Sequence, residues 1–240
     1  GELAELRGDY EEATSATLLA YNTVMLAGSK SFNASMLATR LGNLAALQGR
    51  FDEAATWHER GLSRARENEL PGAIAQAFSG MGEAARRAGD LAAANSYHRE
   101  ALARFETSGS VEGAVFSLAC LGLTATTGGD PSTAIKLLTA SLVRAVDSSD
   151  RRGVALAVEG LADAHAMLDE AQLAARILGA ADALREEIGG APPTSQRGCV
   201  DRAESVARSQ LDADAYDAEH ARGYANAHSI VSSLTSGEPV

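Results

Sequence analysis

Histidine and cysteine side chains are the residues of this chain best suited to chemistry. His58 and His98 lie at the same place in successive segments, where stacked helices would bring their imidazoles near each other. A protein-bound zinc ion needs three or four ligands, and no further ligand follows at matching spacing. We therefore interpret both histidines as packed or half-exposed replacements for aromatic residues, and His165, on the packed face of its predicted helix, in the same way. No metal site and no cofactor are expected.

Catalytic motifs are absent from the sequence. No phosphate-binding loop of the GxxxxGKS/T type occurs. Cys120 lies in an apolar segment without the nearby cations that activate a thiol, so we interpret it as an inert buried residue. Neither a nucleophile–base pair nor a metal-binding set can be assembled from the spacing of the residues. The chain is therefore predicted not to be an enzyme.

Two aromatic residues stand at equivalent positions, because Trp57 and Tyr97 each precede one of the two recurring histidines. Such residues can form an exposed aromatic patch that binds a ligand, or they can pack between repeats. At this helical spacing, packing between repeats is the favoured interpretation.

Composition indicates a globular, helical chain. Aromatic residues make up only 5% of the 240 residues, and alanine and leucine are plentiful. The net charge is −11, from 21 basic and 32 acidic residues without a basic run, so direct contact with nucleic acid is not expected. No segment is long and apolar enough for a membrane, and no signal peptide or CxxC pair occurs. We expect a cytoplasmic protein with free thiols and no membrane contact.

A fixed period organises the chain. Glycines recur at this period, and each is followed at a constant offset by an alanine, in the pairs Gly42/Ala54, Gly82/Ala94 and Gly122/Ala134. A period of about 40 residues is typical of stacked repeats, in which each unit buries its apolar face against its neighbours. The predicted fold class is all-α, an α–α superhelix of helical hairpins of about 40 residues.

Turn signals separate the two helices of each hairpin. Gly49, Gly89 and Gly129 are suited to the left-handed residue that ends a helix. The aspartates that follow Gly89 and Gly129 are suited to capping the next helix. The segment 168–171, Leu-Asp-Glu-Ala, lacks the glycine, so we expect that turn to be tighter or differently closed.

Two domains are predicted from the point where the period breaks. Helical repeats are expected over residues 1–188, with a truncated first repeat, because residues 1–7 resemble the back half of a hairpin. The polar segment 189–194 breaks the register, and residues 189–240 are expected to form capping helices, near 201–210 and 213–226, followed by a flexible tail. The chain is interpreted as a piece of a longer protein.

The pattern resembles the tetratricopeptide repeat. Leu41–Gly42, Met81–Gly82 and Leu121–Gly122 match the Leu-Gly pair of that family's signature, and the later alanines match its second half. The period of 40 departs from the usual ~34, which predicts longer helices or longer loops in each hairpin. His58 and His98 take the place that an aromatic residue usually holds.

A second resemblance comes from the C-terminal part. The segment 174–189, which contains Ile-Leu-Gly-Ala-Ala and is followed by Ala-Pro-Pro at 191–193, is similar to a stretch of actinobacterial multidomain regulators. These are STAND-type signal-transduction ATPases, which often end in a LuxR-family DNA-binding domain. The resemblance implies that this chain is the sensor region of such a transcriptional regulator.

The resemblance also implies where a partner would bind. In this repeat class the first helix of each hairpin lines the concave surface, and the residues three before and one after the Leu-Gly glycine face inward. With neighbours at helical spacing, these positions give the candidate binding residues Thr39, Asn43, Gln76, Ser79, Glu83, Arg86, Arg87, Phe116, Leu123, Glu159 and Asp163. Such a groove would start polar, become apolar and end acidic. It suits an extended peptide or a partner helix, although an ordinary solvated surface is the alternative.

The predicted function is a non-catalytic sensor or regulatory region that binds a protein, a peptide or another domain of its parent protein. A small-molecule effector is a further possible ligand. The alternative is a constitutive adaptor that holds protein partners together and senses nothing.

Overall fold

Helices alone form the described part of the chain, which in this computed structural model comprises residues 9–27, 32–190, 197–238 and 240. The predicted all-α fold class is confirmed, since the described residues contain helices and no strands. The chain divides into two compact units, Gly1–Ser117 and Leu118–Val240, with the boundary inside the helix α7, Val111–Thr127.

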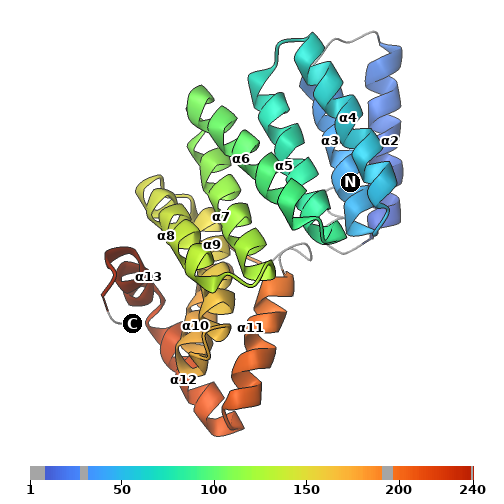
Figure 1. The fold of residues 1–240 in the computed structure, drawn as a ribbon. Coiled ribbons are helices and arrows are strands. Elements are labelled where there is room, and N and C mark those ends of the chain that lie inside the picture. Colours follow the sequence, from blue (N-terminus) through green and yellow to red (C-terminus); the bar gives the residue numbers. More distant parts are fainter. Residues whose placement is uncertain (1–8, 28–31, 191–196, 239) are drawn as a thin grey trace. The chain divides into compact units, whose positions relative to one another are not determined.

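Unit 1 is a row of antiparallel helices (Figure 1). Before the start of α7 it contains α2 (Tyr10–Leu26), α3 (Phe32–Leu47), α4 (Phe51–Glu67), α5 (Pro71–Ala88) and α6 (Leu91–Ser108). Helices α3 and α4 form one hairpin, and α5 and α6 form the next. Helix α5 also packs against both α3 and α4, so that the first helices of neighbouring hairpins lie side by side.

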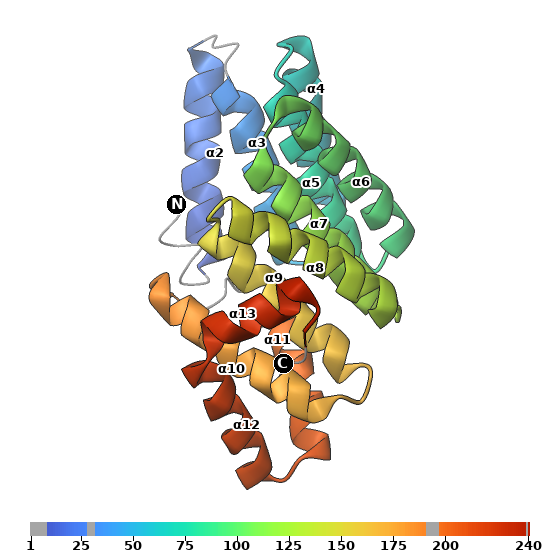
Figure 2. The same ribbon diagram turned by 90° about the vertical axis from the view of Figure 1, so that its left-hand side faces the viewer.

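Unit 2 continues the hairpins and then departs from them. It contains the end of α7 together with α8 (Pro131–Asp147), α9 (Arg151–Ala166), α10 (Ala171–Glu187), α11 (Arg197–Gln210), α12 (Ala213–Ala225) and α13 (Ala227–Ser236). Helix α11 packs on α9 and α10, whereas α12 crosses α10 and has little contact with α11 (Figure 2). The helices expected near 201–210 and 213–226 are thus present as α11 and α12.

The long period arises from helices that are 16–18 residues long from α3 to α10. Connections between these helices are short, so the long period reflects longer helices and not longer loops. A left-handed residue, with φ between 52° and 84°, recurs twice in each period: Gly49, Glu69, Gly89, Gly109, Gly129, Ser149, Asp169 and Gly189.

The turn without glycine closes in the same way as the others, so the expectation of a tighter or different closure is wrong. Asp169 adopts φ 60°, and the Glu170 N–H donates to the His165 carbonyl at 3.2 Å. The corresponding bond from Asp90 to Ala85 measures 2.9 Å. Aspartate tolerates the left-handed region better than most side chains, which is why it can stand in for glycine there.

Aspartate caps begin several helices, as the turn signals predicted. The Asp90 side chain accepts a hydrogen bond from the Ala93 N–H, and Asp130 accepts one from the Thr133 N–H, each at 3.0 Å. These bonds satisfy backbone donors that the first turn of a helix leaves without a partner.

The glycines of the repeat leave room for one ring or branched side chain per hairpin. A Cβ atom on Gly42 would lie 2.7 Å from the His58 ring, and one on Gly122 would lie 2.5 Å from Leu138. His58 and Leu138 occupy equivalent places, two repeats apart. Glycine is therefore required where the first and second helices of a hairpin approach most closely.

The crossing of α10 and α12 is a contact between two backbones. A Cβ on Gly179 would lie 1.9 Å from the His220 carbonyl oxygen, and a Cβ on Gly223 would lie 1.8 Å from that of Arg176. Because the two glycines serve the same crossing from opposite sides, the helices can approach only if both positions lack a side chain.

Candidate binding surface

The polar part of the predicted groove lies on α3 and α5 of unit 1. We call the five residues Asn43, Gln76, Glu83, Arg86 and Arg87 the candidate surface. Asn43 is exposed, and the other four are partly exposed. The two helices pack directly on each other, and the Asn43 side chain lies over the backbone of α5, because a Cβ placed on Gly80 would be 2.8 Å from its Oδ1.

A charged triad on α5 dominates the candidate surface. The Glu83 carboxylate accepts hydrogen bonds from Arg86 at 2.7 and 3.0 Å and from Arg87 at 3.0 Å. The three side chains are only 15–23% exposed, so they are held close to the helix surface. Two guanidinium groups thus bind the same carboxylate.

Thr39 and Ser79 do not line an open surface, which corrects the prediction for these two residues. Their exposed fractions are 5% and 8%. Thr39 packs against the second helix of its own hairpin, since a Cβ on Gly61 would lie 2.8 Å from its Oγ1. The position three residues before the repeat glycine therefore faces the inside of the hairpin in this chain.

The acidic end of the predicted groove is also buried. Glu159 is 1% exposed and Asp163 is 2% exposed, both on α9 in unit 2. Arg185 of α10 donates two hydrogen bonds to Glu159, at 2.6 and 2.8 Å, and Arg202 of α11 donates one to Asp163 at 2.5 Å. Helix α11 packs over this side of α9, so these carboxylates bind the chain's own arginines.

Two apolar candidates differ in exposure. Phe116 of α7 is 38% exposed, as a binding residue would be, whereas Leu123 is 6% exposed. Leu123 packs toward α9, because a Cβ on Gly160 would lie 3.2 Å from its Cδ2. Leu123 is thus part of the core of unit 2, which corrects the prediction that it lines a groove.

Sequence reasoning missed the two arginines that neutralise the buried carboxylates. Arg202 follows Asp163 by close to one repeat length, which is the separation of residues on neighbouring first helices. That spacing is the available signal. Because the segment 189–194 breaks the 40-residue register, this spacing alone does not predict the contact between Arg202 and Asp163.

Burial is the main cause of the pKa shifts of Glu159 and of Cys199 in unit 2. Burial is the largest influence on Glu159 and raises its pKa, while the hydrogen bonds and charge of Arg185 oppose that rise. The pKa of the Cys199 thiol is raised to about 12, first by burial and then by the charges of Glu159 and Asp163. Cys199 is therefore a poor nucleophile.

The two recurring histidines are packed inside unit 1. His58 and His98 are each 0% exposed, and their ring nitrogens have no hydrogen-bond partner among the described residues. Burial lowers the pKa of both to about 4, so both are neutral at pH 7. Their burial agrees with the interpretation as packed replacements for aromatic side chains, and His98 also has ligand atoms of Glu83 and Cys120 within 4.8 Å of its own.

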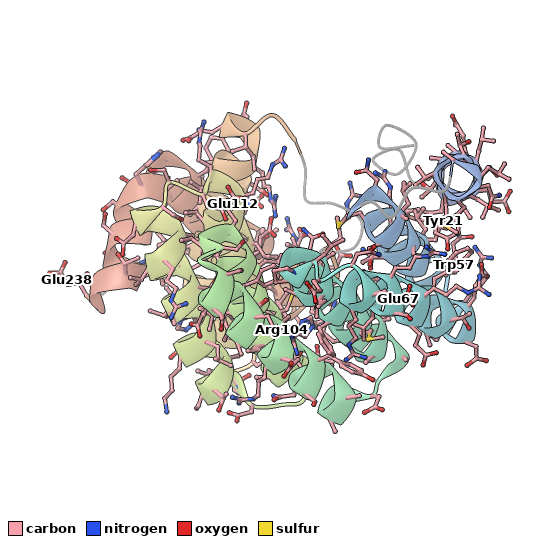
Figure 3. The ribbon with its side chains drawn as sticks, turned by 90° about the horizontal axis from the view of Figure 1, so that it is seen from above. Tyr21, Trp57, Glu67, Arg104, Glu112 and Glu238 are labelled. Atoms are coloured by element: carbon pink, nitrogen blue, oxygen red, sulfur yellow. The ribbon has the colours of Figure 1, made fainter. Side chains whose placement is uncertain are left out.

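The aromatic residues beside them also pack between helices. Trp57 of α4 meets Tyr21 of α2 edge to face, with ring centroids 5.3 Å apart (Figure 3). The ring centroid of Tyr97 of α6 lies 6.2 Å from that of Phe78 of α5. Trp57 therefore packs between neighbouring repeats, as favoured above, and Tyr97 packs within its own hairpin.

A shallow cleft of about 540 Å³ lies in unit 2 where α12 meets α13. Its lining includes Glu186 and Glu187 at the end of α10. Glu187 pairs with Arg151 at 2.8 Å, and Glu186 accepts a hydrogen bond from the Tyr224 hydroxyl. Both carboxylates thus have partners within the unit.

Comparison with known proteins agrees with the interpretation as repeats. Residues 32–107 match the tetratricopeptide repeat family model. This range contains the helices α3, α4 and α5 and almost all of α6. No curated protein matches the chain. Among the described residues, no helix combines the length and the apolar character needed to cross a lipid bilayer.

Solved structures show the same type of fold. A point variant of a kinesin-light-chain candidate from Podosopora anserina with nearly identical TPR-like repeats has a TM-score of 0.57 and 14% identity, covering 78% of this chain and 92% of that chain. A further structure of these repeats has a TM-score of 0.55 and 14% identity, covering 79% and 93%. At this identity the likeness shows the fold alone. The chain is an all-α protein of tetratricopeptide-like helical repeats, a class that offers extended surfaces to protein partners.

Proposed function

We propose that the chain is a non-catalytic binding region in which the candidate surface holds an extended peptide or a partner helix. The observation that carries this proposal is that the side chain of Asn43 of α3 lies against Gly80 of α5, the helix that also carries the Glu83 triad. Polar side chains from two adjacent first helices are thus presented together, partly exposed and held in place. Preorganised groups of this kind lose little conformational entropy when a partner binds.

The parent context that we propose is a larger signalling ATPase or transcriptional regulator. The similarity of the segment 174–189 to actinobacterial regulators supports it. In this setting a ligand would bias the parent protein only by as much as its affinity differs between two arrangements of that protein. A constitutive adaptor is the second candidate, and the binding surface would then serve assembly alone.

A peptide selection tests the binding proposal. A phage-displayed library of random dodecapeptides is selected on the whole chain, and the dissociation constants of enriched peptides are measured by fluorescence anisotropy. We expect Asn43→Ala and Arg87→Ala each to weaken binding about tenfold, or about 1.4 kcal/mol. The control is Arg99→Ala, because Arg99 is exposed on α6 and bonds only Asn95 of the same helix among the described residues.

The opposite result is equally clear. If the selected peptides bind both surface variants as tightly as they bind the unchanged chain, the candidate surface is the wrong place.

Thermal-shift screening with a metabolite set distinguishes a sensor from a constitutive adaptor. A reproducible rise in melting temperature with a small molecule supports the sensor, whereas peptide binding without any such rise supports the adaptor.

A further inference from the structure

His58 lies where three helices of unit 1 meet. Its ring on α4 is 0% exposed and fills a notch between α3 and α5. A Cβ on Gly42 of α3 would be 2.7 Å from the ring, and one on Gly80 of α5 would be 2.4 Å from it. Solvent can therefore reach the imidazole only if α3, α4 and α5 separate.

Packing alone does not explain an imidazole at this place. Both ring nitrogens of His58 are buried without a hydrogen-bond partner among the described residues, which is uncommon in folded proteins. In unit 2 the equivalent position holds Leu138, which fills the notch between Gly122 and Gly160. Leucine fits the same architecture without burying polar atoms, so histidine adds a property that leucine lacks, the ability to take up a proton.

The surroundings of His58 disfavour the protonated ring. Helix α3 presents the neutral Asn43 near it and α5 presents Gly80, while Glu59 and Arg60, next to it on α4, are exposed. Burial is the cause of its lowered pKa, and no charged side chain of the described residues offsets that effect.

The second buried ring, His98, has charged neighbours. Burial is the main cause of its lowered pKa, Glu83 of α5 raises the pKa and Arg86 of the same helix lowers it. Burial alone therefore sets the pKa of His58, whereas charged side chains also act on that of His98.

We propose that unit 1 is an acid-sensitive element, in which protonation of His58 drives α3, α4 and α5 apart and so dismantles the candidate surface. The opening step stands on the packing of His58 alone. Its consequence for a partner rests on the proposed function, because the candidate surface is built from α3 and α5.

The size of the effect follows from proton linkage. An exposed imidazole has a pKa of 6.5, whereas the pKa of packed His58 is about 4, so the open form binds the proton more tightly. The closed form therefore loses stability as the pH falls from 6.5 toward 4. Between pH 7.5 and pH 5 the opening equilibrium should rise about 30-fold, since one pKa unit corresponds to a tenfold change.

Hydrogen exchange measured by mass spectrometry tests the opening step. Exchange of α3 and α4 is followed from pH 7.5 to pH 5 and corrected for the intrinsic pH dependence of amide exchange. We expect protection in α3 and α4 to fall about 30-fold, while α8 and α9, which are built around Leu138, serve as the internal reference. His58→Leu should remove most of this fall, and His228→Leu, at a side chain 77% exposed, should leave it unchanged.

Two results would overturn the proposal. One is protection in α3 and α4 that does not depend on pH between 7.5 and 5. The other is an NMR titration of the unchanged chain, labelled at histidine, that gives His58 a pKa near 6.5 instead of about 4. The titration needs no variant, so it decides the matter even if His58→Leu does not fold.

Peptide affinity separates this proposal from the proposed function. If acid opens α3 and α4 and also weakens binding of the selected peptides, both stand. If acid opens these helices but the peptides still bind, the candidate surface is wrong and the acid-sensitive element remains supported.

Discussion

Removing one partner of the buried Glu159–Arg185 pair should destabilise unit 2 far more than removing both partners together. The two side chains are 1% and 8% exposed, and they share two hydrogen bonds. Glu159→Leu removes the carboxylate to which the buried Arg185 guanidinium donates. Arg185→Met removes the guanidinium that donates to the buried Glu159 carboxylate. Each single change should cost about 3–5 kcal/mol, whereas the double variant should be within about 1 kcal/mol of the unchanged chain or more stable.

Urea unfolding followed by far-ultraviolet circular dichroism measures this difference. With a denaturant slope of about 2 kcal/mol per molar urea, each single variant should shift the unfolding midpoint of unit 2 by about 2 M. Trp57, the single tryptophan of the chain, reports on unit 1 by fluorescence, and its transition separates the two units in the same experiment.

The chain supplies a matched control in the exposed pair Arg50–Glu53, whose side chains are 44% and 39% exposed. Removing either partner of that pair should cost no more than about 1 kcal/mol. The reasoning is refuted if the Glu159 and Arg185 single variants behave like this surface pair, or if their effects simply add in the double variant.

Three further outcomes follow from the local geometry. Gly179→Ala should undock α12 and lower the melting temperature by more than about 10 °C, while Gly198→Ala, where the nearest atom is 3.8 Å away, should leave it nearly unchanged; both are measured by circular dichroism. Asp169→Gly should stabilise the chain by about 1 kcal/mol in urea unfolding, because glycine adopts the left-handed conformation without strain; a loss of stability would contradict this. Cys120 and Cys199 are both buried, so neither should react with iodoacetamide at pH 8 until urea is added, as mass spectrometry can show.

The sequence predicted the helices and their stacking because both depend on local, repeated signals. Glycines at a fixed period marked the close contacts, and the aspartates after the turns marked the helix starts. The closure at Asp169 was mispredicted for a related reason. Glycine is the common residue in that conformation, but the structure needs only a residue that tolerates it.

The candidate surface was predicted only in part, because exposure depends on what covers a helix. Asn43 and Arg87 lie at positions that the repeat leaves accessible on α3 and α5. Asp163 occupies the position on α9 that is equivalent to Asn43, yet α11 returns over it with its own arginine, Arg202. A pattern read along one helix cannot reveal a helix that returns after the register is broken.

A chemical-shift map of the chain with one selected peptide tests the central claim most directly. Two-dimensional NMR of the ¹⁵N-labelled protein should show the largest shifts at Asn43, Gln76 and the segment 83–87, on α3 and α5. Shifts confined to the second helices α4 and α6, or to unit 2, would contradict the claim that partners bind on the first helices of the repeats.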